Sequence, residues 1–467
     1  MDKWLVTEAS NRNYNSEAIN QTLLADMSNY RIIILFFCLT FNISAIIADI
    51  PAASVVREEG IYLTKTEFES FLQQYQTEHT PKSDSGKSFA WKKGLFTITP
   101  YGYINLSASY ETERTTTGDY TVFANSPDLD DDSGFNVDPK STRLGLKIAS
   151  SGIPGWSGSK SEGAIEFDFQ GAFQSRNRGS LLLRKAYVSV SDGQTKFLAG
   201  QDWEIISPLY PKTLNYTAGA CVGNVGYRRA MLRVDRQFNF CNSSHLLTQF
   251  GITDHVFRDN TAVSPASSSW PVIQGRLAYS FGNSCFKHGK PITLGLSSHL
   301  GEQRFTFAGN DRKNLRTWSF NIDFDLPITQ KLGFQMEYFL GENLATIEGG
   351  ILQGVDSQRR NTIRAQGGWA SFTYQATKKL QTNFCYMIDD PFNNDVVSGN
   401  ADNNLARNYS HCLFINALYN WSDALMTGFE VDFWRTHWQR YNTETQTITP
   451  LTPGTPIRYE LTVRYTF

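Results

Sequence analysis

Residues that could act as nucleophiles, proton donors or metal ligands are few in this sequence. Nucleophilic catalysis needs a serine or cysteine beside a histidine that an acid orients. No histidine here accompanies a nucleophile motif such as GxSxG, and no CxxC pair indicates a zinc or redox site. We therefore predict that the chain is not an enzyme and has no catalytic residue, no metal and no cofactor. The histidines considered are His245, His255, His288, His299, His411 and His437.

The cysteines predict at most one or two disulfides. Cys38 lies in an apolar leader, which leaves an odd number in the remaining chain: Cys221, Cys241, Cys285, Cys385 and Cys412. Cys241 and Cys285 fall in neighbouring predicted turns and are the first pair to test. Cys385 and Cys412 fall inside predicted strands, where we expect small packing residues.

Charged residues recur at every second position of otherwise apolar segments. Arg143 and Lys147, for example, alternate with Leu144, Leu146 and Ile148. A period of two is that of a strand, whose side chains point alternately to opposite faces. Arg184 is ambiguous because Lys185 is adjacent to it. The charged residues of this kind are the basic Arg143, Lys147, Arg184, Arg229, Arg233 and Arg276, and the acidic Glu166 and Asp168.

Sixteen segments carry this alternation and are predicted to be strands. In 316–326, five apolar residues from Trp318 to Leu326 alternate with polar ones from Thr317 to Asp325. The predicted spans are 95–110, 141–150, 161–173, 181–190, 195–202, 226–238, 244–257, 272–282, 292–301, 316–326, 331–341, 363–375, 379–389, 408–421, 424–434 and 457–467.

The connections between these segments alternate between long and short. Connections such as 203–225 and 342–362 are long, whereas those at 191–194 and 422–423 are tight turns. This is the pattern of a transmembrane barrel with long outer loops and short periplasmic turns. A closed barrel also leaves no unpaired strand edge in lipid. We predict an all-β fold, a 16-stranded antiparallel transmembrane barrel, which the last strand closes through its terminal Phe467.

Composition agrees with this fold and excludes other classes. Lysine plus arginine number 43 against 45 acidic residues, so no nucleic-acid partner is indicated. Aromatic residues are 13 % of the chain. Mean hydropathy is −0.35, which is too polar for a bundle of membrane helices. A barrel in lipid has this profile because only alternate residues contact lipid.

The first 93 residues are predicted to form a leader and a short helical segment. The apolar run 32–48 follows Arg31 and reads as a signal peptide over 27–48, with 1–26 a mis-start upstream of Met27. A signal anchor is the alternative. In 49–93, Thr64 and Glu67 form a capping box for a helix that continues to Tyr75. The barrel then occupies 94–467.

Several stretches resemble the 16-stranded trimeric outer-membrane porins, and most of all the DcaP-like channels. They are TPYGYINLSASYE, STRLGLKI, LLLRKAYVSVSDGQTKFLAGQDWEIISPLYP, GYRRAMLRVDRQF and the final RYTF. The resemblance is densest over 99–238. It implies a homotrimer in the outer membrane of a Gram-negative-type cell, in contact with lipid and lipopolysaccharide, with passive uptake of small polar or anionic solutes. The helix over 64–75 is similar to the trimerising segment of that family, but shorter.

In a porin, the third long loop folds inward to narrow the channel. Here 203–225 is apolar and aromatic, as a loop packed against a wall would be; folding outward at a trimer contact is the alternative. Its candidate constriction residues are Trp203, Glu204, Pro208, Tyr210, Pro211, Lys212 and Tyr216. The basic residues should face the lumen, because charge on the lipid face is costly. They either favour anions or pair with Glu166 and Asp168 to brace the wall.

Two further features leave alternatives open. The acidic run 127–132 is either a calcium site or a solvated loop tip, and it would repel anions at the mouth. For the whole chain, the expected function is a porin that passes small polar solutes with a mild preference for anions. A non-conducting structural or adhesive barrel is the alternative.

Overall fold

The described part of the chain is a single unit. The computed structural model describes residues 90–116, 120–171, 179–240, 244–254, 264–266, 270–282, 291–399 and 404–467. The chain divides into two compact units, residues 1–87 and 88–467, and every described residue belongs to the second. The predicted leader, the helix over 64–75 and the Cys241–Cys285 pair lie outside the described residues.

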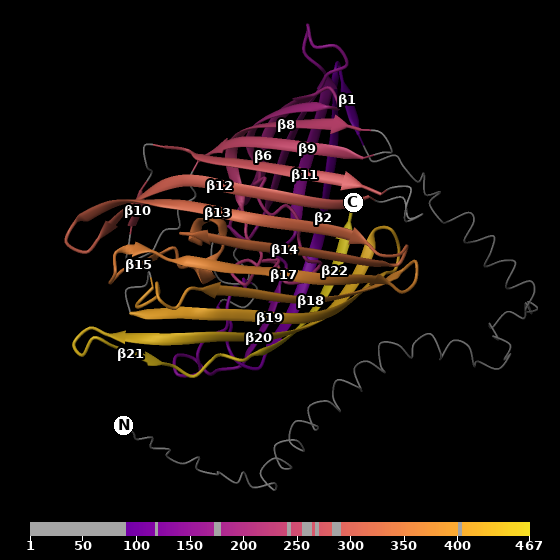
Figure 1. The fold of residues 1–467 in the computed structure, drawn as a ribbon. Coiled ribbons are helices and arrows are strands. Elements are labelled where there is room, and N and C mark those ends of the chain that lie inside the picture. The colour runs from indigo at the N-terminus through magenta and orange to yellow at the C-terminus, as the bar shows by residue number, and fades with distance from the viewer. Residues whose placement is uncertain are drawn as a thin grey trace, which may run out of the picture. The chain divides into compact units, whose positions relative to one another are not determined.

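Sixteen antiparallel strands form a closed barrel (Figure 1). They are β2 (Phe96–Glu111), β4 (Arg143–Ser151), β5 (Lys160–Asp168), β6 (Leu182–Ser191), β7 (Thr195–Trp203), β8 (Arg228–Asn239), β9 (His245–Thr253), β11 (Val272–Phe281), β12 (Ile292–Phe307), β13 (Asp311–Pro327), β14 (Leu332–Glu342), β17 (Arg364–Gln375), β18 (Leu380–Pro391), β19 (Leu405–Asn420), β20 (Leu425–Asn442) and β22 (Ile457–Thr466).

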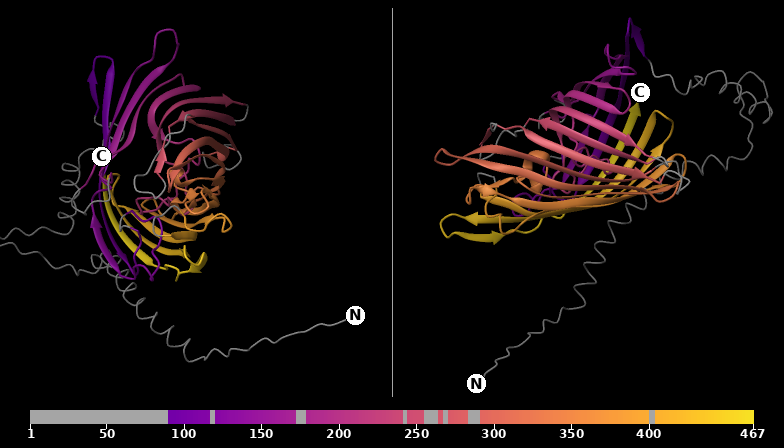
Figure 2. Two further views of the ribbon diagram at one scale, coloured as in Figure 1. Left: turned by 90° about the vertical axis from the view of Figure 1, so that its left-hand side faces the viewer. Right: turned by 45° about the horizontal axis from the view of Figure 1, so that its top comes forward.

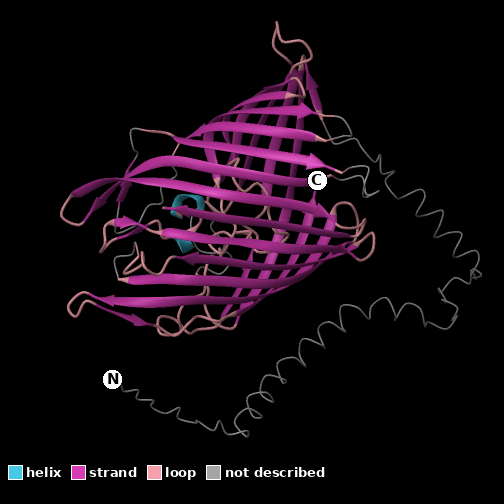
Figure 3. Cartoon of the chain, in the orientation of Figure 1, coloured by secondary structure: helices cyan, strands magenta, loops and turns pink. Residues whose placement is uncertain are grey.

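Short strands and two 3-10 turns accompany the sixteen strands of the wall (Figure 3). They are the strands β1 (Trp91–Lys93), β3 (Gly134–Asp138), β10 (Ser264–Ala266), β15 (Val355–Asp356), β16 (Asn361–Thr362) and β21 (Thr447–Pro450), and the 3-10 turns η2 (Ala345–Ile347) and η3 (Gly350–Leu352). Within the described residues, no helix is long and apolar enough to cross a membrane.

The first and last barrel strands pair and close the ring. Strand β22 lies between β20 and β2, with Ala108 opposite Leu461 in the β2–β22 register. The pairing continues to the last residue, since Phe467 and Gly102 exchange two backbone hydrogen bonds of 3.1 and 3.2 Å. The sheet is therefore continuous from β22 to β2.

Polar residues are buried inside the barrel and apolar residues are exposed outside it. In β13, Ser319 and Asn321 are fully buried, whereas Phe320 between them is 44 % exposed. In β20, Glu430 is buried and Phe433 is 40 % exposed. A soluble sheet would bury the apolar face instead. Lipid is the solvent in which this outward face is stable, as the alternation predicts.

Several boundaries differ from those predicted; the third strand, for example, ends at Asp168 and not at 173. The second strand is interrupted, because β3 and β4 both pair with β2 and residues 139–142 turn between them. The connection predicted at 302–315 is only the turn 308–310. Both strands continue beyond the outward apolar residues that contact lipid, where the alternation of apolar and polar residues ends. Likewise, β20 continues to Asn442 and pairs with β21.

A β-bulge in β6 explains how the adjacent cations Arg184 and Lys185 can lie on the same face of the sheet. The register between β5 and β6 shifts so that Glu166 pairs with Lys185 and Phe167 with Leu183, which leaves Arg184 as the extra residue. A bulge lets two consecutive side chains lie on one face of a sheet. Arg184 and Lys185 both point inward, where they contact Glu166 and Asp202 respectively.

Candidate functional site

Loop 3, defined here as residues 204–227 between β7 and β8, lies inside the barrel and follows its inner wall. Its backbone nitrogens donate to inward side chains of successive strands: Ser207 to Ser297 Oγ of β12 at 3.4 Å, Leu209 to Glu337 of β14 at 2.7 Å, and Leu214 to Glu430 of β20 at 2.8 Å. Beyond these, the Tyr216 hydroxyl donates to Asp168 of β5 at 3.0 Å. The loop thus contacts the wall on both sides of the lumen.

Wall carboxylates hold this loop. Glu430 accepts hydrogen bonds from the Thr213 hydroxyl and from the amides of Leu214 and Asn215. Glu337 accepts from the Leu209 amide and from Trp369 Nε1. Both glutamates are buried. Each satisfies loop amides that would otherwise be buried without a partner.

The predicted constriction residues take distinct positions along loop 3. Glu204 pairs with Arg229 where the loop leaves the wall, and the rings of Trp203 and Tyr210 lie 4.7 Å apart. Pro211 is buried, Pro208 half-buried and Lys212 exposed. Burial and neighbouring carboxylates raise the pKa of the Tyr210 and Tyr216 hydroxyls well above their ordinary value, so both remain protonated donors.

Two other loops also enter the lumen, which the sequence did not indicate. Loop 1 (residues 112–133) buries Val122, Phe123 and Ala124, and loop 6 (residues 343–363) donates from Ile351 N to Asp389 Oδ2 at 3.1 Å. The Trp438 indole of β20 donates to Ala124 O of loop 1 at 2.8 Å. Loops 3 and 6 are joined by the Cys221 amide, which donates to Glu348 O.

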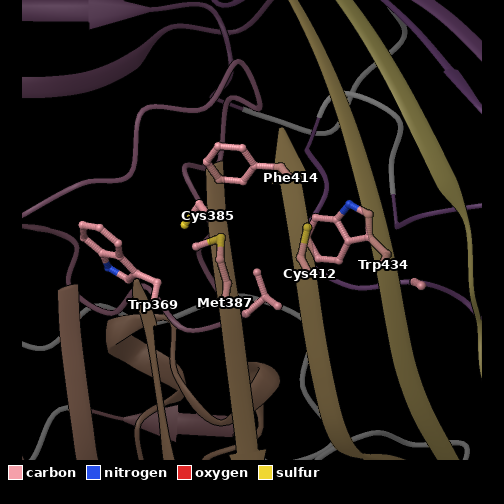
Figure 4. Close-up of a cluster of buried hydrophobic side chains, with 8 residues drawn as sticks. Trp369, Cys385, Met387, Cys412, Phe414 and Trp434 are labelled. Atoms are coloured by element: carbon pink, nitrogen blue, oxygen red, sulfur yellow. The ribbon is translucent and has the colours of Figure 1, made fainter. Parts of the chain in front are cut away.

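These loops cover the wall formed by β17 to β20 with apolar contacts. Ala124 of loop 1 and Val222 of loop 3 pack on inward side chains of four adjacent strands, several of which Figure 4 shows: Trp369, Cys385, Met387, Cys412, Phe414 and Trp434. Cys385 and Cys412 are buried and free, as expected for packing residues. This side of the lumen is filled with protein.

The basic residues predicted to line the lumen fall into two groups, and most are neutralised. Three of them lie in ion pairs with almost no exposure. Arg184 contacts Glu166 at 2.9 Å and Asp168 at 2.8 Å, Arg229 contacts Glu204, and Arg276 contacts Asp323 at 2.6 Å. Arg233 pairs with Asp235 of its own strand at 2.7 Å. These pairs brace the wall.

The second group lies on the wall formed by β22, β2 and β4. Arg143 is 3.7 Å from Glu166 and lies over the Tyr103 ring, and Arg464 lies over the same ring from β22. Lys147, two inward positions from Arg143 along β4, lies over Tyr101. We name these five residues the tyrosine–cation patch: Tyr101, Tyr103, Arg143, Lys147 and Arg464.

The patch is accessible and has more positive than negative charge. Lys147 is exposed, the Arg143 side chain is 24 % exposed and Arg464 is half-buried. The only carboxylate that pairs with a patch residue in the described chain is Glu166, which also receives Arg184 and the Tyr101 hydroxyl. Arg464 donates to the neutral Asn105 at 2.9 Å. Of the three patch cations, only Arg143 contacts a carboxylate of the described chain, and it shares Glu166 with Arg184.

Sequence reasoning missed several residues of this interior. Arg464 stands on the polar face of the last strand, and its alternation with Val463 and Tyr465 is a signal that could have found it. Arg228 has no such signal, because it begins β8 where loop 3 ends. It is buried and lies over Trp203 at 5.0 Å and Tyr227 at 4.6 Å, and its Nε and Nη1 have no hydrogen-bond partner among the described residues.

The histidine nearest to a serine hydroxyl has no access to a substrate. His299 Nδ1 lies 2.7 Å from Ser319 Oγ and its Nε2 lies 2.8 Å from Thr317 Oγ1. His299 is only 2 % exposed and Ser319 is not exposed at all. Both belong to the barrel wall, where their side chains are hydrogen-bonded to each other. His255 and His288 lie outside the described residues.

The acidic run of loop 1 contacts another outer loop. Asp128 accepts hydrogen bonds from the amide and the hydroxyl of Thr452, at 2.7 and 3.1 Å. Nearby, Glu113 accepts from the amide and hydroxyl of Thr455. Loop 1 is thereby joined to the connection between β20 and β22.

The fold is that of outer-membrane porins and channels. The outer membrane channel DcaP of Acinetobacter baumannii matches with a TM-score of 0.62 at 17 % identity, over 80 % of this chain and 99 % of that one. OmpF of Salmonella typhi, solved with daunomycin, matches with a TM-score of 0.51 at 12 % identity, over 81 % and 100 %. An anion-selective porin from Comamonas acidovorans matches with a TM-score of 0.50 at 12 % identity, over 80 % and 100 %.

Sequence comparison alone adds nothing to this, since neither a family model nor a curated protein matches the chain. The resemblance to 16-stranded porins, with DcaP among the matches, is confirmed by structure. Together with the apolar exterior, this fold places the protein in an outer membrane, as predicted.

Proposed function

We propose that this barrel is a porin: it lets small polar solutes diffuse through a water-filled path and mildly favours anions. What supports the path is the uneven covering of the inner wall. Loops 1, 3 and 6 pack on β14 to β20, whereas the tyrosine–cation patch on β22, β2 and β4 keeps exposed charged side chains. Exposed charge inside a lipid-embedded wall needs water.

Loop 3 is proposed to narrow this path. It contacts Glu337 and Glu430 on one side, and its Tyr216 reaches Asp168 and Arg184 on the other. A solute that passes between these contacts would next meet Arg143, which shares Glu166 with Arg184. The narrowest point and the patch would then be adjacent.

The mild anion preference rests on the patch rather than on the paired arginines. An arginine that is fully engaged by carboxylates contributes little net field to the lumen. Of the patch cations, Arg143 shares Glu166 with Arg184 and Arg464 bonds the neutral Asn105. Cations that line a narrow, low-dielectric path raise the local concentration of anions. The acidic loop 1 works against this, which is why the preference is mild.

Reversal potentials in a salt gradient test this proposal. The wild-type channel should favour chloride over potassium. Replacing Arg143, Lys147 and Arg464 together by glutamine should shift the reversal potential toward cation preference. Arg316→Gln is the matched control, because Arg316 is a cation on the outside of the barrel, 70 % exposed, that pairs with Glu342. An unchanged reversal potential in the triple variant would defeat the role of the patch.

A non-conducting structural barrel is the second candidate. The observation that favours it is the extent of loop packing, since three loops contribute buried apolar side chains to the lumen. Insertion into planar bilayers without conductance steps would support this alternative.

We also propose that the protein is a homotrimer. This rests on the family resemblance of the sequence stretches quoted above. Light scattering of the detergent-solubilised barrel, corrected for bound detergent, should give three copies, and a single copy would contradict it.

A further inference from the structure

We propose that the outer surface of β18, β19 and β20 carries a binding site for the phosphate groups of an outer-leaflet glycolipid. Five outward side chains form it: Tyr386, Tyr409, His411, Arg435 and His437, named here the outer basic cluster. The site faces lipid and is separate from the lumen. It depends on the barrel lying in the outer membrane and not on conduction.

The direction of these side chains follows from the register. Cys412 and Trp434 are opposite one another and point inward, because both are buried in the lumen-facing apolar cluster. Their chain neighbours His411 and Arg435 are also opposite one another and so point outward. In β18, Met387 is inward, which leaves Tyr386 on the outer face beside His411.

The five side chains touch and form one surface. Arg435 Nε donates to His437 Nε2 at 3.2 Å, and Tyr386 OH lies 3.2 Å from His411 Nδ1. The Tyr409 ring lies 5.5 Å from each of the two imidazoles. The cluster thus offers one guanidinium, two imidazoles and two phenol hydroxyls within three adjacent strands.

Its height on the barrel is that of lipid headgroups. On the same three strands, toward the periplasmic turns, the outward residues Phe384, Ile415 and Phe433 are each at least 40 % exposed and apolar. The cluster lies on their extracellular side, since β20 runs from the turn at 421–424 toward the outer loop that precedes β22. A cation is expensive in mid-bilayer but costs little at the interface.

The charge of the cluster is not compensated by the protein. Arg435 is exposed and donates a hydrogen bond to His437, and no carboxylate of the described chain lies within ion-pair distance of it. Two other outward arginines at this end do have carboxylate partners: Arg316 has Glu342 and Arg364 has Asp395. The nearest outward acid in β18, Asp390, accepts from Gln366 on the β17 side, away from Arg435.

Phosphate is the group that this chemistry fits. A guanidinium binds phosphate oxygens through paired hydrogen bonds, and imidazole and phenol groups add donors. The tyrosines suit an interface where one edge is apolar and the other polar. Basic pockets at membrane interfaces recognise lipid headgroups in this way.

The test measures binding of diphosphorylated lipid A to the full-length barrel in detergent, with fully dephosphorylated lipid A and inorganic phosphate as parallel ligands. Arg435→Ala combined with His437→Ala should weaken binding of the phosphorylated lipid at least about tenfold, the loss expected for one charge-assisted hydrogen bond. The dephosphorylated lipid should bind weakly to both forms, and inorganic phosphate alone should bind weakly, because the acyl chains also contact the apolar strands.

Arg364→Ala is the matched control, since it removes an outward arginine of the same end that already has a carboxylate partner. It should bind the lipid like the wild type. Unchanged binding by the double variant, or equal binding of the dephosphorylated lipid, would overturn the proposal. Loss of oligomers in the double variant, with lipid binding intact, would also overturn it and assign the surface to a second copy. The heat-dependent gel shift of barrels confirms that each variant is folded.

Discussion

Arg143 and Arg184 both lie beside Glu166, yet their surroundings differ. Arg184 has two carboxylates within 2.9 Å and a side chain that is only 6 % exposed, whereas Arg143 is 3.7 Å from its one partner and reaches water. A buried arginine with full partners is part of the wall. A partly exposed one with a shared partner can interact with solutes. The residue type alone does not separate these roles.

Removing Arg184 should therefore destabilise the barrel. Arg184→Met leaves Glu166 and Asp168 buried without their cation, which we expect to lower the free energy of unfolding by about 3–5 kcal/mol. Adding Glu166→Gln and Asp168→Asn to the same chain should restore most of this. Urea titrations in lipid vesicles measure both. If the single and triple variants were equally destabilised, the pairing would not be the cause.

At the residue level, the sequence predicts which face of the sheet a side chain points to better than it predicts the ion-pair partner of that side chain. The alternation puts Arg143, Arg229 and Arg276 on the polar face of their strands, because side-chain direction is local. It could not decide which cations are neutralised, because Glu204 and Asp323 reach their arginines from other strands and a loop. The bulge at Arg184 and the loop-end position of Arg228 also depend on pairing that a single strand does not contain.

Loop 3 lies inside the barrel and is hydrogen-bonded to its inner wall. Its inward path was predicted from its apolar composition, and the hydrogen bonds from Leu209 to Glu337 and from Leu214 to Glu430 place it there. Gly223 adds a steric requirement. Its φ is +119°, and a Cβ on it would collide with the carbonyl oxygen of Gly368. Only glycine allows the loop backbone to approach β17 so closely.

Glu430 should be the main anchor of this loop. Glu430→Ala leaves the amides of Leu214 and Asn215 and the Thr213 hydroxyl without their acceptor, at a cost of about 1–3 kcal/mol for each buried donor. We expect the Leu214 amide to exchange hydrogen much faster in this variant. Glu342→Ala is the control, because Glu342 bonds wall residues such as Trp318 and does not touch loop 3. Unchanged Leu214 protection in Glu430→Ala would refute the anchoring.

The turn between β6 and β7 should depend on pH through Asp192. Hydrogen bonds from the Thr195 and Gln194 amides and from the Trp156 indole lower the pKa of Asp192 to about 2, from its ordinary 3.8. A lowered pKa means that the carboxylate stabilises the turn above pH 4, and that this contribution is lost as the pH falls toward 2. The Thr195 amide resonance should titrate with a midpoint near pH 2. A midpoint near 4 would contradict this, and Asp192→Asn should abolish the titration.

At the scale of the whole molecule, sequence predicted the architecture almost completely. The sixteen alternating segments correspond to sixteen strands. A wall with lipid outside and polar groups inside requires apolar and polar residues to alternate in every strand. The errors concern strand ends: β3, the end of β5, the short connection at 308–310 and the extension of β20. The inward packing of loops 1 and 6 was not predictable, because their apolar residues have no period.

We propose that a water-filled path remains beside the packed loops. The most direct test is single-channel recording of the purified full-length protein in planar bilayers in potassium chloride. We predict discrete conductance steps, and a partial block when small polar anions are added. Stable insertion, shown by protease protection of the barrel, without any conductance would contradict the account and leave a sealed structural barrel in its place.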